Sequence, residues 1–129
     1  MKLSQIGLVM LGVANIARSV AFYRDTLGLS LRQEVPGFAF FDSGGVTLCL
    51  SEPLAKATGA GAGAGAGATE IVFSVEDVRG AYEALRAKGV EFTIEPRNVT
   101  GTLWSANFQD PDGHRLSVFG PEHGPQPKG

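Results

Sequence analysis

Few residues in this chain carry side chains that could act chemically on a small molecule. Glu70 opens the apolar segment EIVFSV, so its carboxylate could remove a proton, bind a cation or accept a hydrogen bond from a ligand. An ion pair with Arg115 is the simpler alternative for the same carboxylate. Cys49 is the only cysteine, and no histidine in the sequence is placed to act as its base. We therefore expect Glu70 to contact a ligand, with general-base catalysis as the alternative.

Composition and charge exclude several classes of protein. The chain has 129 residues, of which 43% are apolar and 19% charged, as is typical of one globular domain. The formal net charge is -2 and the basic residues are scattered, so we expect no nucleic acid and no membrane surface as a partner. A single cysteine excludes an intrachain disulfide and is compatible with a cytoplasmic location.

A duplication organises the elements that must position these residues. The segment FQDPDGHRLSVFGP has a weaker copy, FDSGGVTLCLSEP, about half a chain earlier, and each copy predicts two strands joined by a tight turn. Asn15 and Asp77 are typical helix N-caps, and Gly28 and Gly89 are typical residues at which a helix ends. Each half therefore predicts the order strand, helix, strand, strand, strand.

This order predicts one domain over residues 1–120. Module one covers residues 1–52 and module two residues 70–120, and residues 53–69 form a linker that contains a strict Gly-Ala alternation. We expect this linker to be flexible and residues 121–129 to be a disordered tail. A phosphate-binding glycine loop is the alternative for the linker, but a strand and not a helix follows it.

The predicted fold class is α+β, with two tandem βαβββ modules that form a cleft between curved mixed sheets. Strand alternation then predicts which side chains line this cleft, with Phe38, Phe40 or Phe92 as further aromatic walls that could equally be sheet core. The residues expected to bind a ligand are Leu8, Met10, Cys49, Glu70, Trp104, Arg115, Ser117 and Phe119.

Four motifs of the sequence resemble a known family. ARSVAFYRDTLGL, FFDSGG, VEDVRGAYEALRAKGVEF and FQDPDGH together resemble the vicinal oxygen chelate superfamily, which includes glyoxalase I, extradiol dioxygenases and the fosfomycin and bleomycin resistance proteins. The resemblance covers residues 3–120 and implies the fold and a homodimer. It does not imply one function, because the superfamily includes isomerases, lyases, dioxygenases, transferases and metal-free binding proteins.

The same resemblance implies a divalent metal held by four side chains in those members that use one. The matching positions are Leu8, Cys49, Glu70 and Ser117, of which only Glu70 is a strong donor for such an ion. Shifting the first strand by three residues would bring Gln5 to the first position. We therefore expect no metal cofactor, with a rebuilt divalent site as the alternative.

These arguments predict a metal-poor protein that binds a small organic molecule in its inter-module cleft and sequesters it, as in antibiotic resistance. The alternative is a lyase, isomerase or dioxygenase of the glyoxalase type that acts on a small oxygenated substrate, with Glu70 as base or metal ligand. A scaffold without any ligand is a third possibility.

Overall fold

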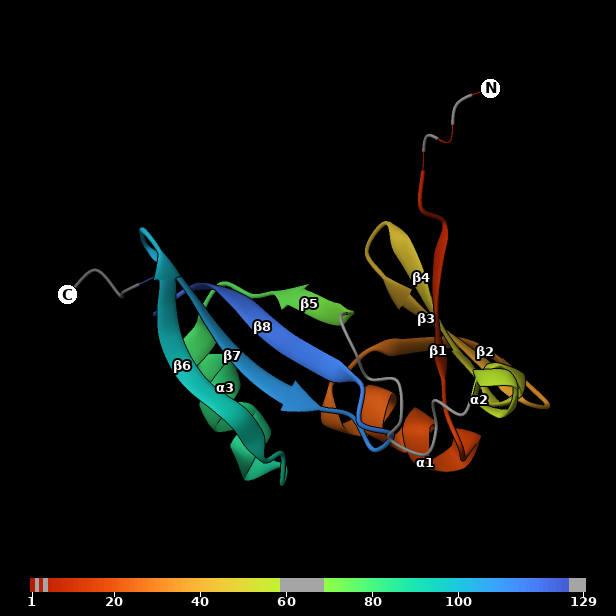
Figure 1. Cartoon of the computed structure of the whole chain (residues 1–129). Coiled ribbons are helices and arrows are strands. Elements are labelled where there is room, and N and C mark those ends of the chain that lie inside the picture. The colour runs from red at the N-terminus through yellow and green to blue at the C-terminus, as the bar shows by residue number, and fades with distance from the viewer. Residues whose placement is uncertain (2, 4, 59–68, 126–129) are drawn as a thin grey trace. The chain divides into compact units, whose positions relative to one another are not determined.

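The computed structural model describes residues 1, 3, 5–58 and 69–125. The chain divides into two compact units, each of which is described by itself: the first contains residues 1–67 and 111–113, and the second residues 68–110 and 114–129. The α+β class and the two tandem βαβββ modules are confirmed (Figure 1).

The first unit contains a four-stranded mixed sheet in the order β1-β4-β3-β2. Strand β1 runs parallel to β4, and the other neighbours are antiparallel. Its elements are β1 (Leu8–Gly12), α1 (Ile16–Val20), the π-helical segment η1 (Ala21–Thr26), β2 (Ser30–Val35), β3 (Phe38–Ser43), β4 (Val46–Ser51) and α2 (Glu52–Thr58).

Helix α1 begins where the sequence predicts. The Asn15 side chain accepts a hydrogen bond from the backbone N–H of Arg18 at 3.0 Å, which satisfies a donor that the helix itself cannot. Gly28 adopts a left-handed φ of 81° after the helical segment. The helical residues cover one face of the sheet, where the rings of Tyr23 and Phe41 lie 6.0 Å apart and both are fully buried.

The predicted linker begins too early, because α2 continues the chain as a helix from Glu52 to Thr58. The Ser51 hydroxyl accepts from the backbone N–H of Leu54 at 3.0 Å and so acts as a helix cap. The Glu52 carboxylate accepts from the backbone N–H of Ile16 at 2.9 Å, which anchors the start of α2 to the start of α1. The Gly-Ala alternation itself, residues 59–68, lies outside the described residues.

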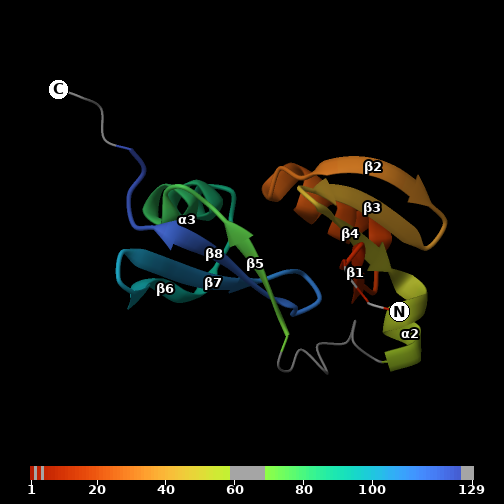
Figure 2. The same ribbon diagram turned by 90° about the horizontal axis from the view of Figure 1, so that it is seen from above.

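The second unit repeats this plan with strands in the order β5-β8-β7-β6, and α3 covers one face of the sheet (Figure 2). The Asp77 side chain caps α3 by accepting from Gly80 N at 2.7 Å, as predicted. On the covered face the Tyr82 and Phe92 rings lie 4.6 Å apart. The elements are β5 (Glu70–Ser74), α3 (Val78–Ala87), β6 (Phe92–Thr100), β7 (Leu103–Gln109) and β8 (Arg115–Pro121).

Three predicted boundaries differ from the structure. The apolar pattern predicts a first strand over residues 3–13, but β1 spans only Leu8–Gly12. It predicts a strand over residues 90–94, but β6 spans Phe92–Thr100. The predicted tail is partly ordered: the Glu122 backbone carbonyl accepts from Arg79 N at 3.0 Å, and its carboxylate pairs with the Arg79 side chain at 2.6 Å. Residues 126–129 lie outside the described part of the chain.

Candidate functional site

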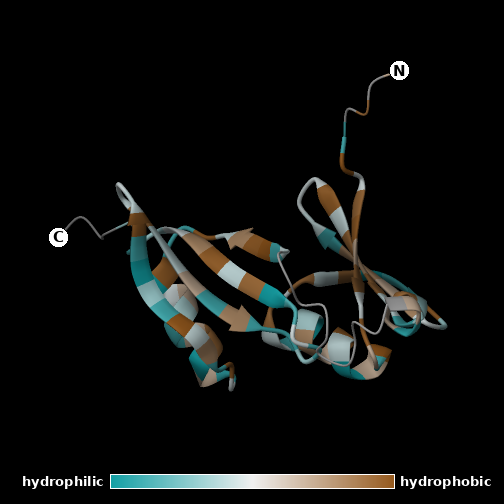
Figure 3. Ribbon diagram, in the orientation of Figure 1, coloured by the Kyte–Doolittle hydropathy of each residue, from teal (hydrophilic) through white to brown (hydrophobic). Residues whose placement is uncertain are grey.

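The face of the second sheet opposite α3 carries the side chains that are best suited to bind or react with a small molecule. Strand pairing brings them into rows across β5, β8 and β7, because directly paired residues point to the same face. Strand β8 is hydrophilic where it begins and mostly apolar along its middle (Figure 3). One row contains Glu70, Arg115 and Gln109, the next Val72, Ser117 and Asn107, and the third Ser74, Phe119 and Ser105. We call this surface the open face.

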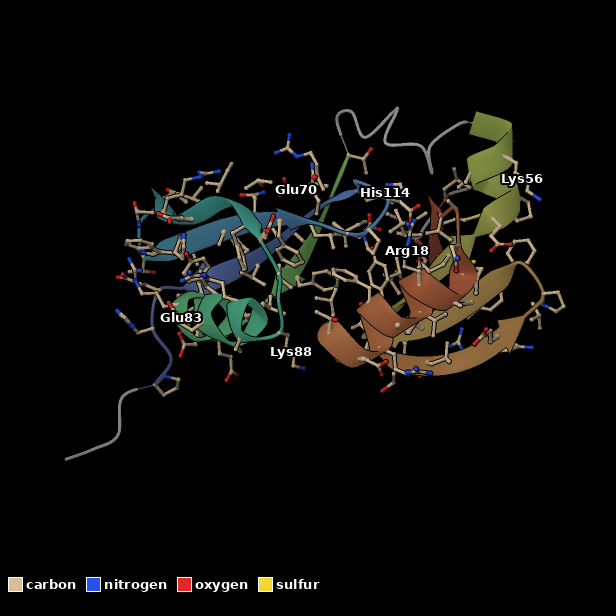
Figure 4. The ribbon with its side chains drawn as sticks, turned by 90° about the horizontal axis from the view of Figure 1, so that it is seen from below. Arg18, Lys56, Glu70, Glu83, Lys88 and His114 are labelled. Atoms are coloured by element: carbon tan, nitrogen blue, oxygen red, sulfur yellow. The ribbon has the colours of Figure 1, made fainter. Side chains whose placement is uncertain are left out.

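Glu70, labelled in Figure 4, is the centre of a polar cluster on the open face. Its Oε1 atom accepts two hydrogen bonds, from Asn107 Nδ2 at 2.9 Å and from an Arg115 guanidinium nitrogen at 3.1 Å. The ion pair with Arg115 that the sequence suggested therefore forms. Asn107 was missed at the sequence level, because its position on β7 relative to Glu70 depends on strand pairing that no motif specifies.

Two polar atoms of this cluster lack partners. Among the described residues, Asn107 Oδ1 and Ser117 Oγ are the buried side-chain oxygen or nitrogen atoms for which the structure provides no hydrogen bond. The two residues are paired across β7 and β8 and are 5% and 1% exposed. Buried polar groups normally have a partner, so this pair of atoms indicates a place for a ligand group or an ordered water.

Apolar side chains flank these two atoms. Val72 is the β5 partner of Ser117 and is 50% exposed, so its apolar side chain is available to a ligand. Ile94 pairs with Asn107 from β6, and Phe119 follows Ser117 by one step along the same face of β8; both are half-buried. The open face thus combines hydrogen-bonding groups with a hydrophobic border, which is the usual composition of a small-molecule site.

The first unit also has an uncovered sheet face. Leu8 and Met10 lie there as predicted and are 41% and 42% exposed. Met10 and Phe40 both pair with Cys49, whose side chain is fully buried on this face. Burial raises the pKa of the Cys49 thiol above its ordinary value, which disfavours the thiolate and therefore a nucleophilic role.

A bulge in β2 places a cation beside this face. The pairing of β2 with β3 slips between Leu31 and Gln33, and Arg32 occupies the slip. Its guanidinium donates to Asp42 Oδ1 and to Thr47 Oγ1, both at 3.0 Å. Sequence reasoning missed this contact, because a bulge changes the direction of a side chain without a change in the hydrophobic pattern.

One predicted ligand residue lies on the other face of the second sheet. Trp104 pairs with Gly120, and the Arg79 guanidinium of α3 lies 5.2 Å from the centre of its ring. The expectation that Trp104 shares a face with Glu70 is therefore wrong, because the register of β7 turns it toward α3. Of the three further aromatic residues considered, Phe92 belongs to the core under α3.

A pocket of about 470 Å³ lies at the end of α3, lined by residues that include Arg86, Glu91 and Glu95. These three charged side chains are exposed to solvent, and no buried atom without a partner lines this pocket among the described residues. The open face is therefore the better candidate for a binding site.

The turn between β7 and β8 belongs to the first unit and carries a buried carboxylate. The Asp112 side chain is fully buried and accepts from three groups: Ala14 N at 2.9 Å, the Arg18 guanidinium at 3.0 Å and Ser19 Oγ at 3.2 Å. Arg18 lies on α1 (Figure 4). Sequence reasoning assigned Asp112 only to a tight turn, so this structural role was missed.

The comparisons with known proteins agree with the resemblance. Residues 5–118 match the family described as the Glyoxalase/Bleomycin resistance protein/Dioxygenase superfamily. The chain belongs to this superfamily. It is 43% identical over 115 residues to the metallothiol transferase FosB of Staphylococcus epidermidis, which covers 88% of this chain and 81% of FosB. It is 32% identical to the uncharacterised protein YraH of Bacillus subtilis (strain 168), over 92% of this chain and 98% of YraH.

A solved structure supports the same assignment. A glyoxalase/bleomycin resistance protein/dioxygenase from Nocardioides is 29% identical and superposes with a TM-score of 0.75, over 100% of this chain and 91% of that one. The fold of this superfamily member is thus established, whereas its chemistry must be argued from its own residues.

The donors of this superfamily member do not fit a divalent metal. Leu8 offers no donor atom, and the Cys49 thiol is buried and donates to the Leu50 carbonyl at 3.6 Å. The Glu70 carboxylate is occupied by a positive Arg115, which would repel a cation. No group of three or more His, Cys, Asp or Glu side chains within the described ranges is arranged to hold a metal ion.

Proposed function

We propose that this protein binds a small organic molecule on the open face of its second sheet and holds it without a metal. The observation that supports this most is the pair of buried, unpartnered atoms, Asn107 Oδ1 and Ser117 Oγ, within a polar cluster bordered by apolar side chains. Sequestration of a toxic compound, as in antibiotic resistance, is the corresponding biological role. The inter-module cleft expected from the sequence stays a prediction.

The superfamily and its relatives make an antibiotic the first ligand to test. The family description includes bleomycin resistance proteins, and the relative from S. epidermidis is named a metallothiol transferase. Sequestration requires tight binding but no chemical step. The raised pKa of the buried Cys49 thiol disfavours it as a nucleophile, and the Glu70 carboxylate is paired with Arg115.

We expect the full chain, purified in the presence of EDTA, to bind bleomycin or a planar polycyclic antibiotic with a Kd of about 1 µM or below. Isothermal titration calorimetry would measure this. Val72→Asp places a charge in the apolar border and should weaken binding at least about tenfold. Val99→Asp is the matched control, because Val99 is 46% exposed near the far end of β6. Equal weakening by both variants, or no binding of bleomycin or of any planar polycyclic antibiotic tested, would contradict the proposal.

An enzyme is the second candidate, favoured by the relationship to FosB. In that case the Glu70 carboxylate would act as base through Oε2, the oxygen that does not accept from Asn107 or Arg115. Product formation from a bound compound, lost in Glu70→Gln while binding persists, would replace sequestration by catalysis. A requirement for added divalent metal would show that the site is rebuilt around an ion.

We further propose that the protein forms a homodimer. Strand β1 is an edge of the first sheet, and two of its apolar side chains are exposed: Leu8 is 41% and Met10 42% accessible. Ile6, which precedes the strand, is 70% accessible. An apolar edge strand left in water favours association with another chain. Light scattering should give twice the chain mass, and the double variant Leu8→Lys and Met10→Lys should give the monomer mass. A wild-type monomer at about 100 µM would contradict this.

The location is proposed to be the cytoplasm, on the basis of the single cysteine. In the described part of the chain, no helix combines the length and the apolar character needed to cross a membrane.

A further inference from the structure

We infer that the open face selects ligands that donate a hydrogen bond, and that the side-chain carbonyl of Asn107 makes this selection. The inference rests on the proposed function and adds the chemical class of the ligand. The class is a flat apolar group that carries an N–H or O–H donor, of which a primary aromatic carboxamide is the simplest example.

Glu70 determines which end of the Asn107 amide is available. A carboxylate oxygen only accepts hydrogen bonds, so the Asn107 group that lies 2.9 Å from Glu70 Oε1 must be its amino group, Nδ2. Arg115 donates to the same Glu70 oxygen and so helps to hold the carboxylate in this orientation. The other end of the amide, Oδ1, is therefore an acceptor with no partner in the structure.

Ser117 completes the pattern, because its hydroxyl lies directly across from Asn107 on β8 and also has no partner. A hydroxyl can donate as well as accept. A carboxamide could thus donate an N–H to Asn107 Oδ1 while its own carbonyl accepts from Ser117 Oγ. A carboxylate has no hydrogen to donate, and its negative charge would lie against the Asn107 carbonyl oxygen.

The apolar border explains why the donor should be attached to a flat group. Val72, Ile94 and Phe119 lie on the same face as Ser117 and Asn107, and each is at least partly exposed. An aromatic ring could cover these side chains while its polar substituent reaches the two oxygen atoms.

Access requires a rearrangement of neighbouring side chains, because both unpartnered atoms are buried. Arg115 is able to move, since its side chain is 48% exposed and is held by a hydrogen bond to Glu70. When Arg115 swings toward solvent, Glu70 keeps its bond to Asn107, so the orientation of the amide is retained.

Three aromatic fragments of the same shape test the inference on the full chain labelled with nitrogen-15. Benzamide carries the donor, acetophenone replaces its NH2 group by a methyl group, and benzoate replaces it by a negative oxygen. We expect benzamide to shift the backbone amide resonances of β7 and β8 around Asn107 and Ser117, with a Kd at least about tenfold lower than that of acetophenone or benzoate.

Two variants test whether the Asn107 carbonyl causes the preference for benzamide. Asn107→Leu should abolish the benzamide preference, because it removes the acceptor while it keeps the branched shape of the side chain. Glu70→Gln should also lower the preference, because a glutamine amide can donate and so allows the Asn107 amide to turn over. Gln33→Leu is the control, since Gln33 is an exposed amide on β2 of the first unit and not on the open face, and it should leave the preference unchanged. If Asn107→Leu does not fold, the loss of preference expected in Glu70→Gln tests the inference by itself.

The outcomes distinguish the inference from the proposed function. If the fragments shift the open face but acetophenone or benzoate binds as tightly as benzamide, the inference is wrong and the proposed function stands. If neither the fragments nor the antibiotics perturb this face, the proposed function is wrong and the inference is wrong with it.

Discussion

Replacement of Asp112 by alanine should lower the free energy of unfolding by about 3 kcal/mol, because three donors lose one buried, charged acceptor. The Asp112 carboxylate accepts from Ala14 N, the Arg18 guanidinium and Ser19 Oγ, and its side chain is fully shielded from water. Ser19 is also fully buried, so its hydroxyl cannot turn to solvent. Equilibrium unfolding in urea, followed by circular dichroism, would measure the loss.

Two further variants define the cause of this loss. Asp112→Asn keeps an acceptor oxygen but removes the charge, so it should lose less than Asp112→Ala. Asp25→Ala breaks the exposed ion pair with Arg24 and should lose much less stability than Asp112→Ala. A loss of below about 1 kcal/mol in Asp112→Ala would show that the buried carboxylate contributes no more than a surface charge.

Gly120→Ala should destabilise the second unit by about 2 to 3 kcal/mol, because the added methyl group has no space. A Cβ atom at Gly120 would collide with the backbone carbonyl oxygen of Val75 and lie 3.1 Å from the Val75 carbonyl carbon. The backbone at this position is also held by the hydrogen bond from Val75 N to Phe119 O at 2.9 Å. Relief of the collision would therefore separate the ends of β5 and β8.

Urea unfolding would measure the loss, and hydrogen exchange at the Val75 amide would locate it. Gly45→Ala is the matched control, because no atom lies within 4 Å of the position of its Cβ and its φ is not left-handed. Gly45 should tolerate alanine with a change of below about 0.5 kcal/mol. If both alanine variants unfold at the wild-type urea concentration, the close approach of the two backbones is not a constraint in solution.

The order of elements could be predicted from the sequence because local chemistry specifies it. Asn15 and Asp77 cap their helices through their own side chains, and Gly28 and Gly89 adopt the left-handed φ values of 81° and 93° that favour glycine. These signals act within a few residues. The helix α2 was missed because its proline and the glycine-rich segment after it resemble a linker. Its cap, Ser51, could not be identified from the sequence, because serine is equally common in turns.

The candidate site was only partly predictable because it depends on pairing between distant strands. Glu70, Arg115 and Ser117 were identified from alternation within β5 and β8, and the structure places all three on the open face with Phe119. Asn107 was missed and Trp104 was placed on the wrong face, since both lie on β7. The register of β7 is specified by its pairing with β8 and β6, and bulges interrupt the pairing with β6. No short sequence motif therefore shows which β7 side chains point to which face of the sheet.

The membership of residues 111–113 in the first unit limits how this protein could be divided. A fragment that ends at residue 67 would contain Ala14, Arg18 and Ser19 but not the carboxylate that satisfies them. Although the two halves repeat each other in sequence, the first half is therefore not equipped to persist as a separate gene product. A tandem duplication that once produced such a chain would have become irreversible when the second copy began to supply part of the first copy's interior.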